Sequence, residues 1–282
     1  MSDILAFIGG GNMARSLIGG LIDDGHPADA ILVSEPNPEA ASALRDTLGV
    51  QTMSDNRAAV ASADVLLLAI KPQVLAGVCA EIAGEVREHR PLVISIAAGI
   101  RADSIDDWLG GQTALVRCMP NTPAMVKAGM TGLYANPGVS AAQRRRAETI
   151  LRAVGETLWV ENEELLDAVT AVSGSGPAYY FLFMEAMIEA GEALGLDPDA
   201  ARKLTLQTAL GAASMAIGSD ESPATLRRRV TSPGGTTEQA IHRFEAAGLR
   251  EIISEALRAA RDRSIELSAQ LGAPGNARDL KK

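Results

Sequence analysis

Short, uninterrupted apolar runs alternate with amphipathic segments through the first part of the chain. Such runs are typical of strands that are covered on both faces, and their alternation with helices favours a parallel sheet with right-handed crossovers. The amphipathic pattern predicts helices over residues 12–24, 38–48 and 141–153. The apolar runs predict strands over residues 4–8, 31–33, 65–70, 92–97, 115–119, 132–135 and 157–160.

The hydrophobic pattern changes after Glu161. From Leu165 to Leu271 only helical periodicity is present, and glycine-rich stretches interrupt it. We therefore expect two domains, an α/β domain at residues 1–162 and an all-α domain at residues 163–282.

Composition and charge narrow the possible functions. The chain carries 26 basic and 35 acidic side chains, a net charge of −9, which argues against a nucleic-acid partner because phosphates require a basic face. No apolar run approaches the roughly 20 residues that span a bilayer, and no signal peptide is recognisable, so we expect a cytoplasmic protein with no membrane partner. Cys79 and Cys118 are too few for a disulfide framework, and the three histidines lack metal-ligand spacing, so no metal site is expected.

The segment Gly9–Ala14 fits the pattern G-x-G-x-x-A between a predicted strand and a predicted helix. In that context Gly9 permits a tight turn, Gly11 lets the backbone approach a pyrophosphate, and Ala14 allows close packing of helix and strand. The start of the helix would present free N–H groups to the phosphates. The alternative is a glycine-rich turn without a ligand. The expected cofactor contacts in this segment are Gly9, Gly10, Gly11, Asn12, Met13 and Ala14.

Glu35 follows the second predicted strand, where an acidic residue can accept hydrogen bonds from the ribose diol of NAD. Its charge would repel the 2′-phosphate of NADP. However, Ser34, Asn37 and Asn56 could hydrogen-bond that phosphate, so the choice between NADH and NADPH stays open at this point. The alternative role for Glu35 is a solvated loop carboxylate.

Three more strands end at the same edge of the predicted sheet, where ligands of parallel sheets bind. Lys71 would point into this crevice, or else it is a surface lysine at a strand end. Small residues at 97–99 would leave room for a nicotinamide ring, and a loop with two prolines at 119–123 could line the cleft. The cofactor contacts expected here are Ala69, Ile70, Lys71, Pro72, Ala97 and Asn121.

Two segments of the helical half are rich in glycine and hydroxyl residues. Ser173–Pro177 and Ser232–Thr237 each precede a predicted helix. Free N–H groups at such a helix start can hold a carboxylate without a basic side chain. The alternative is ordinary N-capping by serine and threonine.

Five motifs, in order along essentially the whole chain, resemble those of the pyrroline-5-carboxylate reductase family. The resemblance implies reduction of the cyclic imine 1-pyrroline-5-carboxylate to L-proline with NADPH or NADH, the final step of proline biosynthesis. It also implies an α/β Rossmann-type dinucleotide-binding domain followed by an all-α dimerisation domain, in homodimers that often form decamers. The motifs are Gly9–Ala14, Ala69–Pro72, Cys118–Pro123, Ser173–Ala178 and Ser232–Thr237.

The resemblance also assigns roles. Thr237 would hydrogen-bond the ring nitrogen, and the backbone of Ser232–Thr236 would hold the substrate carboxylate. Family members usually accept NADPH, and many also use NADH. Where the family commonly has a small hydroxyl residue, this chain has Glu35, which puts the NADPH preference in doubt. The expected substrate contacts are Ser175, Ser232, Gly234, Gly235, Thr236 and Thr237.

The apolar positions of the helical half exceed what a small domain can bury by itself. We therefore expect an obligate dimer through these helices, with the active site completed across the subunit interface. Two other functions compete with the reductase. β-Hydroxyacid dehydrogenases use a lysine early in the helical domain, and no lysine lies between Leu165 and Arg202. A dinucleotide sensor would bind the cofactor without turnover.

Overall fold

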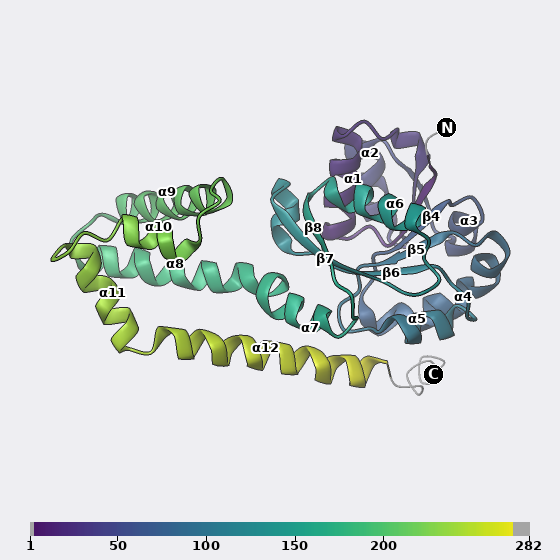
Figure 1. Ribbon diagram of the computed structural model, residues 1–282. Helices are drawn as coiled ribbons and strands as arrows, with labels where there is room; N and C mark the ends of the chain where they lie inside the picture. The colour runs from purple at the N-terminus through teal and green to yellow at the C-terminus, as the bar shows by residue number, and fades with distance from the viewer. Residues whose placement is uncertain (1–2, 273–282) are drawn as a thin grey trace. The chain divides into compact units, whose positions relative to one another are not determined.

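The computed structural model describes residues 3–272 (Figure 1). Eight strands form one sheet in the order β3-β2-β1-β4-β5-β6-β7-β8. All neighbouring strands pair in parallel except β6 and β7, which pair antiparallel. The sheet is therefore mixed, whereas the sequence pattern favours a parallel sheet. The strands are β1 (Leu5–Ile8), β2 (Ile31–Ser34), β3 (Gln51–Met53), β4 (Val65–Leu68), β5 (Leu92–Ser95), β6 (Leu115–Met119), β7 (Gly129–Ala135) and β8 (Gly155–Trp159).

Helices connect the strands. The predicted helix at 38–48 is confirmed with the same bounds, because Asn37 caps its first N–H groups, a proline occupies its first position and Gly49 ends it in the left-handed region. The helices between and after these strands are α1 (Asn12–Asp23), α2 (Pro38–Leu48), α3 (Asn56–Ala61), α4 (Pro72–His89), α5 (Ala102–Trp108), α6 (Ala141–Arg152) and α7 (Leu165–Val169).

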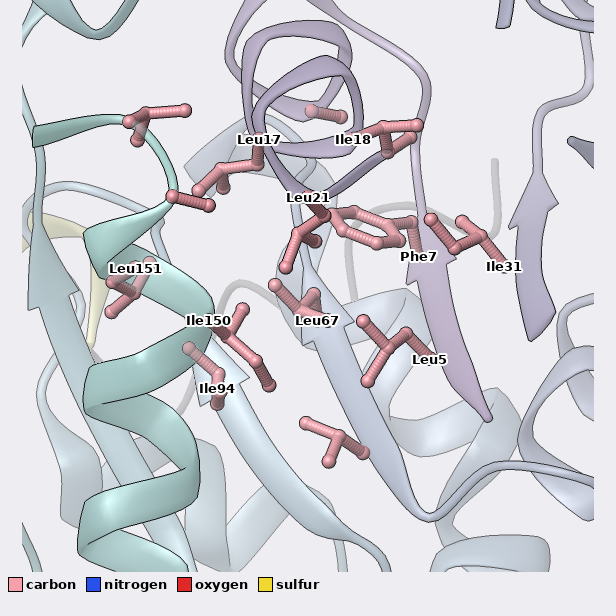
Figure 2. Close-up of a cluster of buried hydrophobic side chains, with 14 of the residues drawn as sticks. Leu5, Phe7, Leu17, Ile18, Leu21, Ile31, Leu67, Ile94, Ile150 and Leu151 are labelled. Carbon is pink, nitrogen blue, oxygen red and sulfur yellow. The ribbon is translucent and has the colours of Figure 1, made fainter. Parts of the chain in front are cut away.

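Both faces of the sheet are covered, as the apolar runs predict. Leu5 and Phe7 of β1 belong to one core cluster with residues of α1 and α6, whereas Ala6 and Ile8 belong to a second cluster with residues of α3 and α4. Figure 2 shows the first cluster, in which Ile150 of α6 and the side chains of α1 lie against the strands. Each fully buried aliphatic or phenylalanine side chain contributes about 1.5–3 kcal/mol. The two clusters together hold the strands in place, and the loops considered below follow the carboxyl ends of these strands.

The chain divides into two compact units, one of which comprises the residues up to Ser175 and those from Ala260 on. The other unit, Gly176–Ala259, is wholly helical and we call it the helical unit. The division expected near residue 162 marks a change of sequence pattern rather than of contacts, and it stays a prediction. The remaining helices are α8 (Gly176–Ala193), α9 (Pro198–Ile217), α10 (Pro223–Arg229), α11 (Thr236–Ala246) and α12 (Leu249–Leu271).

The helical unit buries little of its apolar surface. Within α8–α11 the buried residues are Gly176, Ala201 and Thr205, and α8 and α9 approach each other closely at Gly191. Leu194 and Ile217 remain 88% and 87% exposed. A soluble unit rarely leaves so much apolar surface uncovered, and such a surface marks an interaction site.

The end of α12 belongs to the sheet-containing unit. Ser264 of α12 donates a hydrogen bond from its hydroxyl to the carboxylate of the buried Asp167 at 2.6 Å. One turn further on, α12 lies against Gly99, where an added Cβ would be 3.6 Å from both Leu267 and Leu271. The small residues after β5 were expected to leave room for a ligand, but at Gly99 that space is filled by α12.

Candidate functional site

The glycine loop lies at the point where the strand order reverses, between β1 and β4. Gly9 has φ +95°, and a Cβ there would lie only 2.6 Å from the carbonyl oxygen of Ala69. Glycine is therefore required for the two strand ends to meet. Gly11 is the N-cap of α1, and a Cβ on it would meet nothing within 4 Å. The backbone at Gly11 is thus open to a ligand, as a pyrophosphate requires.

The other expected residues of this loop have distinct environments. Asn12 is exposed at the start of α1, Met13 is half-buried, and Ala14 is buried against the sheet. The N–H groups of the first turn of α1 have no acceptor within the helix, and their role as an anion site stays a prediction.

Glu35 is attached to the glycine loop. One oxygen of its carboxylate accepts the N–H of Gly10 at 2.9 Å, and the other accepts the N–H of Asn37 at 3.0 Å. Backbone donors thus position both oxygens of this half-buried side chain, and its contact with the ribose stays a prediction. The charge is held at the end of β2, beside the residues expected to bind the cofactor.

Ser34 and Asn56 form a chain of hydrogen bonds next to Glu35. The Ser34 hydroxyl donates to the Asn56 Oδ1 atom at 2.7 Å, and the Asn56 amide donates to the Glu81 carboxylate of α4 at 3.2 Å. Ser34 is buried and Asn56 is half-buried. Glu81 has no motif around it, so the sequence pattern gave no sign of this partner.

The loop after β4 continues the same edge. Ala69 and Ile70 are half-buried, Lys71 is exposed at the N-cap of α4, and Pro72 is the first residue of that helix. The N–H of Ala69 donates to Ile8 at the end of β1, which keeps this loop beside the glycine loop. The predicted cofactor residues of β1, β2 and β4 are thus neighbours in space.

Two expected residues further along the edge are enclosed. Ala97 is packed in the second core cluster. Asn121 is buried after β6: its amide donates to the carbonyl of Ser173 at 3.0 Å, and its Oδ1 atom accepts the N–H of Met130 at 2.9 Å. Both polar groups of Asn121 therefore hold segments of the protein together, and its contact with the cofactor stays a prediction.

A buried ion pair supports the end of β6. A terminal nitrogen of Arg117 lies 2.9 Å from a carboxylate oxygen of Glu163, and the two side chains are only 6% and 10% exposed. The Glu163 carboxylate also accepts a hydrogen bond from the N–H of Ala102. A charged residue inside the apolar run at 115–119 was the one sequence signal for this pair. Its partner, 46 residues later, could not be identified from the pattern.

The segment Ser173–Pro177 is not the open loop that its composition suggests. Residues Thr170–Gly174 form a π-helical turn that continues α7, and Ser175 has helical dihedral angles before α8 begins. Gly174 lets the Met119 side chain pack closely, since a Cβ there would lie 2.5 Å from the Met119 Cε atom. The half-buried Ser175 remains a candidate substrate contact, but on a helix rather than in a loop.

The segment Ser232–Thr237 does form a loop and a helix start. Gly234 has φ +71°, and Gly235 is the N-cap of α11, so no serine or threonine side chain caps this helix. The N–H of Gly234 donates to the Glu238 carboxylate, and that of Gly235 to the carbonyl of Ser232. The N–H groups of the first turn, from Thr236 on, have no acceptor within the helix. Ser232, Gly234, Thr236 and Thr237 are exposed.

Two findings on residues 3–272 concern metal ions and membranes. Within that range no group of three or more His, Cys, Asp or Glu residues could hold a metal ion. In the same part of the chain, no helix combines the length and the apolar character of a membrane span.

Two family models match the chain. Residues 163–267 match pyrroline-5-carboxylate reductase dimerisation, and residues 4–99 match NADP oxidoreductase coenzyme F420-dependent. The chain is 53% identical to a pyrroline-5-carboxylate reductase of Pseudomonas aeruginosa over 95% of this chain and 98% of that protein.

Solved structures agree with the sequence comparison. A pyrroline-5-carboxylate reductase from Coxiella burnetii matches with a TM-score of 0.92 and 47% identity over 95% of this chain and 99% of that one. The Plasmodium falciparum pyrroline carboxylate reductase with NADP bound matches with a TM-score of 0.83 and 27% identity, over 94% and 98% of the chains. The Rossmann-type α/β fold followed by helices, as predicted, is confirmed.

Proposed function

Because the chain belongs to the pyrroline-5-carboxylate reductase family, we propose that it reduces 1-pyrroline-5-carboxylate to L-proline by hydride transfer from NAD(P)H. It is an NAD(P)H-dependent oxidoreductase, and the reaction is the final step of proline biosynthesis. The observation that carries the proposal is the full-length match, in which both the dinucleotide-binding part and the dimerisation part of the family are present.

The cofactor site in this proposal is the edge formed by the ends of β1, β2 and β4. The free N–H groups at the start of α1 hold the pyrophosphate, and the open backbone at Gly11 lets it approach. Glu35 lies where the adenosine ribose binds. Bound NAD(P)H supplies the hydride. The buried contacts of Asn121 keep the end of β6 rigid while the ligand binds.

The substrate site in this proposal is the start of α11. The carboxylate of the imine accepts hydrogen bonds from the N–H groups of Thr236 and Thr237, where the positive end of the helix dipole favours an anion. Gly234 and Gly235 shape the loop, and Ser232 and Ser175 contact the substrate. The Thr237 hydroxyl bonds to the ring nitrogen as the imine becomes an amine, since a hydroxyl can both donate and accept.

In this proposal, hydride transfer to the imine needs few catalytic groups from the protein. A protonated imine is already a good hydride acceptor, so the enzyme works mainly by holding the two reacting carbons together in alignment. No general acid with a shifted pKa is needed for this step.

The assembly in this proposal is a homodimer through the helical unit. Helices α8–α11 leave large apolar side chains exposed, such as Tyr180 at 69%, in the region that matches the dimerisation model. A second copy of the chain covers them. We also propose that the active site is completed across this interface, that five dimers assemble into a decamer, and that the enzyme works in the cytoplasm.

Turnover separates the reductase from a dinucleotide sensor. Purified protein should oxidise NADH or NADPH only when 1-pyrroline-5-carboxylate is present, and L-proline should accumulate in equal amount. A 3-hydroxy acid with NAD should give no turnover, which tests the hydroxyacid dehydrogenase alternative. Tight cofactor binding without imine-dependent oxidation would contradict the proposal.

A further inference from the structure

We infer that NADH is the preferred hydride donor. The carboxylates of Glu35 and Glu81 would repel the 2′-phosphate of NADPH at the position where it would bind. The inference deepens the proposed function and rests on it. It depends on which groups at the end of β2 are already engaged and which charges remain there.

The first step concerns Glu35. Its two oxygens accept the N–H groups of Gly10 and Asn37 at 2.9 and 3.0 Å, so the carboxylate is fixed rather than free to swing away. Each oxygen keeps further lone pairs, and these can accept the two hydroxyls of an adenosine ribose. A dianionic phosphate at the same place would face a fixed negative charge.

The second step concerns the groups that could offset this repulsion. The Ser34 hydroxyl already donates a hydrogen bond to Asn56. The Asn56 amide nitrogen donates to the Glu81 carboxylate, whose two oxygens lie 3.2 and 3.4 Å away. Ser34 and Asn56 therefore have protein partners already, and the third candidate, Asn37, uses its Oδ1 atom to cap α2. In addition, Glu81 brings a second negative charge into the same neighbourhood.

The third step concerns the cations nearby. Arg15 donates from Nε to the carbonyl of Gly10 and from a terminal nitrogen to the carbonyl of Ala40. Arg57 donates to the carbonyl of Glu81 and lies 3.9 Å from the carboxylate of Glu85. Arg15 is thus held on Gly10, the residue whose N–H binds Glu35, and it is the cation that we expect a phosphate to recruit once the Glu35 charge is removed.

The test measures kcat/KM with NADH and with NADPH and compares their ratio among variants. The wild type should favour NADH by about tenfold or more. Glu35→Gln keeps a hydrogen-bond acceptor and removes the charge, and it should shift the ratio toward NADPH by about 5–30-fold. Glu35→Ser should do the same. Adding Arg15→Gln to Glu35→Ser should cancel most of the gain with NADPH.

Glu81 acts through Asn56 as a positioning residue. Glu81→Gln should shift the ratio toward NADPH by about 2–5-fold, less than Glu35→Gln because its charge is more distant and more exposed to screening. Glu88→Gln is the matched control, since it removes the same charge from the same helix away from Asn56, and its ratio should stay within about twofold of the wild type. A merely structural role of Glu81 would lower both rates and leave the ratio unchanged.

Binding measurements keep this inference separate from the proposed function. Affinities for NADH and NADPH, measured by fluorescence without the imine, should follow the same order as the kinetic ratios. If NADH binds more tightly but no imine is reduced, the proposed function fails and this inference stands. A wild type that prefers NADPH, or a ratio that Glu35→Gln does not move, would overturn the inference.

Discussion

The carboxylate of Glu238 accepts a hydrogen bond from the N–H of Gly234 at 2.7 Å, so the loop before α11 is tied to the first turn of its own helix. The N-cap itself is Gly235, which has no side chain to contribute. The hydroxyl of Thr237 is therefore not needed to cap the helix. Its position on the exposed first turn leaves it for a ligand instead.

Thr237→Val tests this role. The substitution keeps the shape of the side chain and removes only its hydrogen-bonding group. We expect kcat/KM for the imine to fall by about 10–150-fold, which corresponds to about 1.5–3 kcal/mol of lost transition-state stabilisation. NAD(P)H affinity and the melting temperature should barely change.

Thr237→Ser is the control, because it restores the hydroxyl and should restore most of the rate. Should Thr237→Val instead lower the melting temperature and leave the rate intact, Thr237 would be a structural residue. A stable Thr237→Val protein with an unchanged rate would remove this side chain from the active site.

A second prediction uses two glycines of the loop between β1 and α1. Gly9→Ala forces a Cβ to within 2.6 Å of the Ala69 carbonyl oxygen at φ +95°, and should lower the free energy of unfolding by about 1–3 kcal/mol. Gly11→Ala meets nothing in the protein, so its stability should match the wild type. Its NAD(P)H affinity should still fall at least tenfold, because the Cβ would obstruct the pyrophosphate. Calorimetry and fluorescence titration measure the two effects, and an undiminished affinity of Gly11→Ala would move the pyrophosphate elsewhere.

The sequence pattern predicts elements best where local signals agree. The helix at 38–48 has its cap, its proline and its terminal glycine within the segment, and all three act locally. Strand β3 was missed because its three residues Gln51–Met53 are partly exposed and form no apolar run. The direction of β7 was missed because strand direction depends on the pairing partner rather than on the strand itself.

The site was predictable to a similar degree. The glycine loop can be recognised in the sequence, because glycine is needed where φ is positive and where strand ends meet. The Gly174 segment misled because glycine there serves close packing against Met119 inside a helix rather than a turn. The partners of Asn121 and Ser34 lie 52 and 22 residues away, so only the folded chain brings them together.

A third prediction concerns the dimer. If a second copy covers the exposed apolar residues of α8–α11, dilution should lower activity and stability together. Leu210→Glu, at a position that is 61% exposed here, should shift sedimentation toward the monomer and abolish most of the activity. Glu192→Gln is a control on an exposed polar position of α8 and should leave the dimer intact. A fully active monomer would contradict the proposed assembly.

The last prediction concerns the two thiols. Burial raises the pKa of Cys79 from 9.0 to about 12, and it also raises that of Cys118 despite the opposing charge of Arg117. Between those values a Cys79 thiol ionises in the unfolded chain but stays protonated in the native protein. The unfolded state then binds fewer protons, so stability is complete below pH 9 and falls as the pH rises toward 12. At pH 10.5 the free energy of unfolding should be lower by about 2 kcal/mol on account of this thiol.

Urea unfolding at pH 8 and pH 10.5 measures this loss of stability. Cys79→Ala, although less stable at both pH values, should lose less stability between them. An equal loss in both proteins would show that other groups cause the pH dependence.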